Sequence, residues 1–162
     1  MDAPFHILAV EDDESDALLI ERVALQSGLV GSIRVLQTAE ESQVYLLGEE
    51  PYADREIFPA PDVVLLDLKL RRMSGLDLLR WIRLTPALRG TSVVVLSGTA
   101  SESNLNRAYE LGIEGYLVKP MGFRGLANTL AGVLVTLPRR RAPLVKPAGD
   151  PTEGDGRFVR PA

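Results

Sequence analysis

The run from Asp62 to Asp67, Asp-Val-Val-Leu-Leu-Asp, constrains the fold more than any other stretch of this chain. Its central residues are all apolar and do not alternate with polar ones, so the strand they form must be covered on both faces. Such a strand belongs in the middle of a parallel sheet. The run ends in a carboxylate, and open α/β sheets usually keep their chemistry at the carboxyl ends of their strands. Asp67 is therefore the first candidate for a functional residue.

Strand-like and helix-like segments alternate five times over residues 1–137. Short apolar runs predict the strands, and apolar residues at intervals of three or four predict the helices. Right-handed crossovers then give a parallel sheet with helices on both faces, and the flavodoxin-like strand order 2-1-3-4-5 fits best. The predicted strands are 5–10, 33–36, 62–67, 92–97 and 115–119, and the predicted helices begin near 15, 38, 76, 101 and 123.

Composition and charge exclude several classes of protein. The formal net charge is −4, whereas a nucleic-acid binder usually carries a basic surface, so we expect no nucleic-acid partner. We expect no membrane span and no secretory signal, and therefore a cytoplasmic protein, because the apolar runs are too short. The absence of cysteine excludes disulfides and thiolate chemistry. We expect residues 1–137 to form one domain, and the proline- and arginine-rich 138–162 to form a disordered tail.

Polar residues stand at the carboxyl ends of four predicted strands. Glu11 and Asp12 follow the first strand, and Asp67 ends the third. Ser97 ends the fourth strand and Lys119 the fifth. Because these ends meet at one edge of a parallel sheet, we expect the side chains to lie together.

Several carboxylates at one edge repel one another, and two charges about 4 Å apart do so by roughly 4 kcal/mol at an effective dielectric near 20. A divalent cation removes this cost, and oxygen ligands with room for water and phosphate suit Mg²⁺ better than zinc. A lysine and a hydroxyl beside the cation would meet phosphoryl oxygens. The pattern therefore indicates an aspartate nucleophile that accepts a phosphoryl group in line.

Residues 5–137 resemble the receiver domain of two-component response regulators. The motifs that carry the resemblance occur in the family's order and spacing: Val10-Glu11-Asp12, Leu66-Asp67 with Gly75 eight residues on, Leu96-Ser97-Gly98, and Tyr116-Leu-Val-Lys119-Pro120. This chain departs from the family's pattern at three positions. The family commonly has proline at the position of Arg71, usually has alanine at that of Gly98, and more often has aspartate at that of Glu11.

The resemblance implies a role for each acidic residue at this edge. Asp67 would be the phosphoacceptor. Glu11 and Asp12 would hold Mg²⁺ together with Asp67, and the backbone carbonyl of Lys69 would be a further ligand.

The resemblance also implies the residues that respond to phosphorylation. Ser97 stands at the Thr/Ser position that moves toward the phosphoryl group, and Tyr116 stands at the switch aromatic. Lys119 is the family's lysine, and a cis peptide bond would precede Pro120.

The function that the resemblance implies is that of a single-domain regulator, not an enzyme with a metabolite substrate. A sensor histidine kinase would donate the phosphoryl group, and the 49–61 loop is similar to that of regulators served by phytochrome-type kinases. An unknown downstream protein, or a homodimer formed through the last two helices and the last strand, would receive the signal.

Two alternatives remain open. A phosphatase of the haloacid dehalogenase type would need a second aspartate two residues after Asp67, where Lys69 stands. A phosphorylation-independent binding module would keep the fold but has no need of the acid pair, Ser97 and Lys119.

Overall fold

The computed structural model describes residues 3–98, 101–119 and 122–138, and these ranges contain a five-stranded parallel sheet in the order β2-β1-β3-β4-β5. The predicted fold class and strand order are confirmed. The predicted tail 138–162, apart from its first residue, and the predicted cis bond at Pro120 lie outside the described residues. The strands are β1 (Phe5–Val10), β2 (Val30–Leu36), β3 (Val63–Leu66), β4 (Ser92–Ser97) and β5 (Gly115–Val118). The helices are α1 (Glu14–Gln26), α2 (Ala39–Leu47), α3 (Gly75–Leu84), α4 (Glu102–Leu111) and α5 (Phe123–Leu134).

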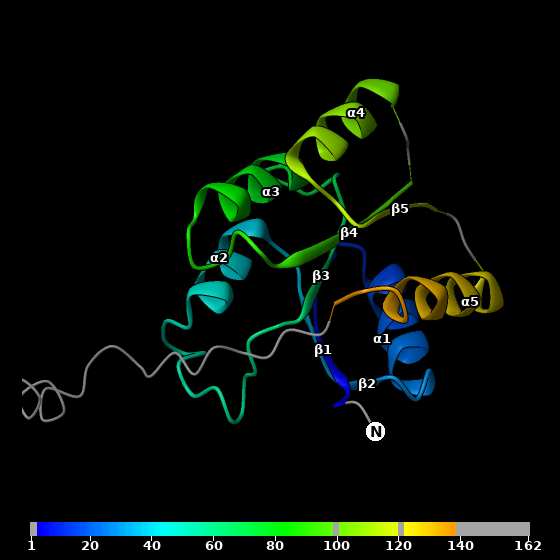
Figure 1. The fold of residues 1–162 in the computed structure, drawn as a ribbon, viewed down its shortest axis with the longest axis horizontal. Helices are drawn as coiled ribbons and strands as arrows, with labels where there is room; N and C mark the ends of the chain where they lie inside the picture. The colour runs from blue at the N-terminus through cyan, green and yellow to red at the C-terminus, as the bar shows by residue number, and fades with distance from the viewer. Residues whose placement is uncertain (1–2, 99–100, 120–121, 139–162) are drawn as a thin grey trace, which may run out of the picture.

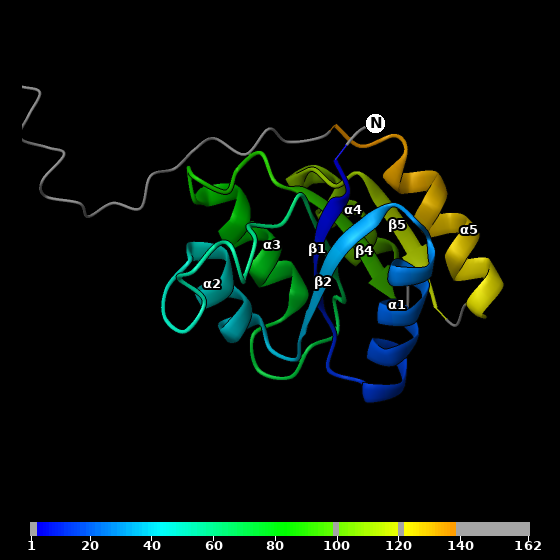
Figure 2. The same cartoon turned by 90° about the horizontal axis from the view of Figure 1, so that it is seen from below.

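Helices cover both faces of the sheet, as Figures 1 and 2 show. Helices α1 and α5 pack together on one face, and α2, α3 and α4 lie on the other. Each layer encloses its own cluster of buried apolar side chains. Strand β3 contributes to both clusters, and none of its side chains is more than 3% exposed. The unalternating sequence of β3 is therefore explained by its position between the two layers.

Local sequence signals set where the helices begin. The side chain of Thr38 accepts a hydrogen bond of 3.1 Å from the backbone nitrogen of Glu41, which confirms the predicted start of α2. Asp13 caps α1 in the same way, by accepting from the nitrogen of Asp16 at 2.9 Å. These caps fix the first turns of both helices near the carboxyl edge of the sheet.

Strand β2 is longer than the sequence predicts. It begins at Val30, which pairs with Phe5, whereas the pattern of apolar residues places its start at Ile33. The sequence does not predict the first part of the strand because neither Gly31 nor Ser32 has a high strand propensity. Pairing with β1 imposes the extended conformation there, and the Ser32 hydroxyl lies 2.7 Å from the ring nitrogen Nδ1 of His6.

The long connection between α2 and β3 is held by aromatic rings. The ring of Tyr52 lies 5.0 Å from that of Tyr45 and 5.2 Å from that of Phe58. The guanidinium of Arg34, on β2, lies 5.2 Å from the Phe58 ring centre. This cluster holds the loop beside the edge strand β2. None of the helices in the described ranges is both long enough and apolar enough to cross a bilayer.

Candidate functional site

The strand register brings the predicted site residues to one edge of the sheet. Val10 at the end of β1 pairs with Leu66 at the end of β3, so the residues that follow them leave the sheet side by side. The nitrogen of Asp67 donates to the carbonyl of Val10 at 3.1 Å, and the nitrogen of Glu11 donates to the carbonyl of Leu36 at 2.9 Å. These backbone bonds hold the two acidic residues in neighbouring positions.

Glu11, Asp12 and Asp67 can each present a carboxylate oxygen such that all three oxygens lie within 4.8 Å of one another. Glu11 is only 1% exposed and Asp67 only 8% exposed. Burial, together with the neighbouring Asp67 carboxylate, raises the pKa of Glu11 to about 8. Within the described ranges, Glu11 Oε2 is a buried oxygen without a hydrogen-bond partner. Crowded carboxylates and a buried, unsatisfied oxygen fit a hard divalent cation such as Mg²⁺.

The ammonium group of Lys119 lies among the carboxylates. Lys119 Nζ donates to Glu11, to Asp67 Oδ2 at 3.2 Å and to Asp16 Oδ2 at 3.1 Å. Burial disfavours the ammonium, but hydrogen bonds to Glu11 and Asp16 outweigh it, and the pKa of Lys119 is raised. Lys119 therefore carries its positive charge at neutral pH and offsets part of the repulsion between the acids.

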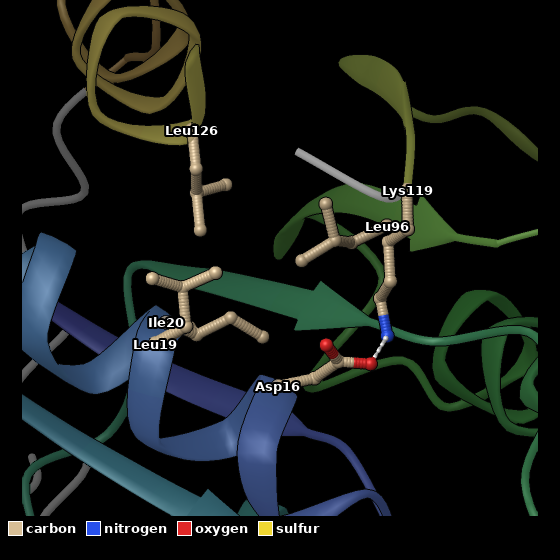
Figure 3. Close-up of a pocket in the computed structure, with 6 residues that line it drawn as sticks. All are labelled: Asp16, Leu19, Ile20, Leu96, Lys119 and Leu126. Atoms are coloured by element: carbon tan, nitrogen blue, oxygen red, sulfur yellow. Dashed lines mark hydrogen bonds and ion pairs between the residues drawn. The ribbon is translucent and has the colours of Figure 1, made fainter. Parts of the chain in front are cut away.

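Asp16 is the member of this group that sequence reasoning missed. It lies in the first turn of α1, not at a strand end, and Figure 3 shows its carboxylate directed at the Lys119 ammonium. The two residues border a small hollow between α1, β4 and the start of α5. Apolar side chains complete its lining: Leu19, Ile20, Leu96 and Leu126.

The predicted switch residues lie on the two neighbouring strands. Ser97 is fully buried at the end of β4, and its carbonyl accepts a hydrogen bond of 2.8 Å from the nitrogen of Lys119. Tyr116 on β5 pairs with Val95 of β4. Its hydroxyl is buried and, among the described residues, has no hydrogen-bond partner. Ser97 thus lies on the strand next to β3, and Tyr116 lies one strand further from the carboxylates; the switch roles of both residues remain predictions.

The loop after Asp67 turns back over the site. The nitrogen of Lys69 donates to Asp67 Oδ1 at 2.9 Å, which orients the carboxylate, while a metal-binding role for the Lys69 carbonyl remains a prediction. Arg71 stands where the family commonly has proline, and its Nε lies 3.8 Å from Asp12 Oδ2. The next residue, Arg72, adopts a left-handed backbone conformation with φ of 65°. The departure at Arg71 therefore places an exposed cation beside the acidic cluster.

Comparison with known proteins agrees with this geometry. Residues 7–131 match the family model of the response regulator receiver domain. The chain is 37% identical to the probable methanogenesis regulatory protein FilR2 of Methanothrix harundinacea, over 78% of this chain and 79% of that protein. It is 30% identical to response regulator Rcp1 of Synechocystis, over 83% of this chain and 94% of that protein.

Solved structures show the same likeness. The Mn²⁺-bound form of Rcp1 superimposes with a TM-score of 0.70 and 30% identity, over 83% of this chain and 99% of that one. The phosphorylated cyanobacterial phytochrome response regulator RcpA gives a TM-score of 0.72 and 30% identity, over 81% of this chain and 91% of that one. With the family model matching most of its length, the chain belongs to the family of response regulator receiver domains, which are signalling modules.

Proposed function

We propose that this receiver domain accepts a phosphoryl group on Asp67 from a sensor histidine kinase, in a Mg²⁺-dependent reaction. The observation that carries the proposal is the contact between Asp67 and Lys119 inside a group of three carboxylates. A nucleophilic carboxylate, a neighbouring cation and an acidic cluster able to hold a metal are the parts that phosphoryl transfer to an aspartate requires.

Each residue has a definite task in this reaction. A carboxylate oxygen of Asp67 forms the new oxygen–phosphorus bond as the phosphorus–nitrogen bond of a phosphohistidine breaks, and the imidazole leaves with a proton. The nitrogen of Lys69 holds the other oxygen, Asp67 Oδ1, in place. Lys119 neutralises charge on the phosphoryl oxygens. Mg²⁺ bound by Glu11, Asp12 and Asp67, with the Lys69 carbonyl, would supply further neutralisation of that charge.

The relatives support the choice of donor and of metal. RcpA is a phytochrome response regulator whose structure is of the phosphorylated protein, and Rcp1 has been solved in a Mn²⁺-bound form. A divalent cation of the same charge suits the oxygen ligands here. We therefore propose a phytochrome-type histidine kinase as the first donor to test.

The output of the domain is a change of surface. A phosphoryl group on Asp67 adds negative charge at the ends of β3, β4 and β5, where Ser97 and Lys119 can meet it. The unsatisfied hydroxyl of Tyr116 gives β5 a side chain that can take a second position. Val118 is 50% exposed and Phe123 is 38% exposed at the β5–α5 edge, so this edge offers apolar surface to a second copy or to a downstream protein.

Phosphotransfer from candidate kinases tests the proposal. Autophosphorylated histidine kinases, including phytochrome-type ones, are mixed with the wild-type chain and with the Asp67→Asn variant, and transfer of label is followed over time. We expect rapid transfer from at least one kinase to the wild-type chain in Mg²⁺ and none to the variant. Equal labelling of both chains would place the acceptor elsewhere.

A further inference from the structure

We propose that Asp16 is a positioning residue that holds the Lys119 ammonium in place while the other partners of Lys119 are engaged with metal and phosphoryl group. The inference rests on the proposed phosphoryl transfer to Asp67 and adds to it a residue from α1. The observation behind it is the hydrogen bond of 3.1 Å from Lys119 Nζ to Asp16 Oδ2 (Figure 3).

The hydrogen bonds of the ammonium group account for all of its donors. A lysine ammonium has three N–H donors. In this structure the three acceptors are carboxylate oxygens of Glu11, Asp16 and Asp67. The side chain of Lys119 is 13% exposed, so water has little access to replace a lost partner.

The three acceptors have different roles in the proposed reaction. Asp67 accepts the phosphoryl group, and Glu11 belongs to the carboxylate group that can hold a metal ion. Asp16 does not belong to that group, so it remains a partner of Lys119 when the other two are engaged. Without Asp16, the flexible lysine chain would lose its remaining fixed acceptor as the site becomes loaded.

The position of Asp16 is itself fixed by the start of α1. Its backbone nitrogen donates to Asp13 Oδ1 at 2.9 Å, so the capping bond anchors the turn that carries the carboxylate. The side chain of Asp16 is 42% exposed, so its ion pair with Lys119 contributes little energy. The hydrogen bond can still orient the Lys119 ammonium. The geometry therefore indicates a kinetic role and only a small contribution to stability.

The experiment compares initial rates of phosphorylation by acetyl phosphate in saturating Mg²⁺, with the adduct measured by intact mass spectrometry. We expect Asp16→Asn to slow the reaction about fivefold, because it replaces the charge-assisted hydrogen bond of a partly exposed ion pair by a neutral one. Asp16→Glu, which keeps the carboxylate, should recover most of the rate. Glu14→Gln is the matched control because it removes the same charge from the same helix turn at an exposed residue, and its rate should stay within twofold of wild type.

A second readout needs neither metal nor phosphodonor. In the metal-free protein, the ¹H–¹⁵N signal of the Lys119 ammonium should be protected from exchange with water in the wild-type chain and in Glu14→Gln. Asp16→Asn should speed that exchange, while its melting temperature stays near that of Glu14→Gln. An unchanged signal in Asp16→Asn would overturn the inference.

The two proposals fail in different ways. If the wild-type chain gains a phosphoryl group and Asp16→Asn reacts as fast as Glu14→Gln, the role of Asp16 is refuted and the function of Asp67 stands. If the wild-type chain gains none, the proposed function fails, and the ammonium signal alone decides whether Asp16 positions Lys119.

Discussion

Gly75 lies so close to the backbone of Asp67 that a Cβ atom on Gly75 would overlap the Asp67 carbonyl oxygen. The same Cβ would come within 2.6 Å of the Cα of Leu68, and the Gly75 nitrogen donates to the Leu68 carbonyl at 3.0 Å. Glycine thus lets the start of α3 close against the end of β3, which fixes the loop that follows Asp67.

Replacing Gly75 by alanine should therefore disturb both the fold and the site. Because backbone atoms cannot move aside as a flexible side chain can, we expect a loss of roughly 1–3 kcal/mol in the free energy of unfolding. Phosphorylation of Asp67 should slow as well. Gly132→Ala is the control, since a Cβ there meets nothing within 4 Å and alanine favours a helix by about 0.5–1 kcal/mol. Urea denaturation measures the stability of both variants. Equal stability of Gly75→Ala and Gly132→Ala would contradict the close approach of Gly75 to the backbone of Asp67 and Leu68.

Lys119→Gln should destabilise the metal-free protein. It leaves the buried Asp67 carboxylate without its cation, and removing one partner of a buried ion pair costs about 3 kcal/mol or more. Saturating Mg²⁺ should recover part of the loss because the metal ion supplies the missing positive charge. Lys69→Gln, at an exposed lysine, is the control and should change little. An equal loss in both variants, measured by urea denaturation, would show that the Lys119 charge is not needed.

The raised pKa of Glu11 predicts how stability depends on pH. Its pKa is about 8 in the folded protein against an ordinary 4.5, so the folded state binds this proton more tightly than the unfolded state does. That contribution to stability is complete below about pH 4.5 and is lost as the pH rises toward 8. We expect the melting temperature of the metal-free wild type to fall over this window more steeply than that of Glu11→Gln. Parallel curves would mean that Glu11 is not the titrating group.

The boundary of the domain can be tested by truncation. Leu137 is 7% exposed and packs in the cluster under α1 and α5, so the folded domain must include it. We expect deletion of 138–162 to leave the melting temperature nearly unchanged. Leu137→Ala should instead cost about 2–5 kcal/mol of stability if the site cannot collapse. A large fall in the truncated chain would show that the deleted residues stabilise the domain.

Sequence reasoning reached Asp67, Glu11 and Lys119 because of one geometric rule. Parallel strands end at the same edge of a sheet, so residues far apart in the chain can be placed together from strand assignments alone. The shared contacts of Lys119 with Glu11 and Asp67 are consistent with that placement. The rule needs only that the strands be recognised, and apolar runs such as that of β3 are easy to recognise.

Asp16 could not be found in this way because it comes from a helix. The available signal was its spacing: Asp13 caps α1, and Asp16 follows three residues later, in the first turn above the edge of the sheet. That spacing is equally common in helices where the acid only favours the helix dipole. Deciding whether Asp16 contacts the site or only favours the helix dipole required the position of Lys119. That position depends on how β5 and α1 pack. The early start of β2 was missed for a similar reason, since pairing with β1 decides it.

Intact mass spectrometry after treatment with acetyl phosphate tests the central claim most directly. The wild-type chain, with and without Mg²⁺, is compared with Asp67→Asn, whose amide cannot form the acyl phosphate. We predict a single added phosphoryl group in the wild-type chain, dependent on Mg²⁺ and absent from the variant. A wild-type chain that gains no phosphoryl group under any condition, or an Asp67→Asn chain that gains one equally well, would contradict the account.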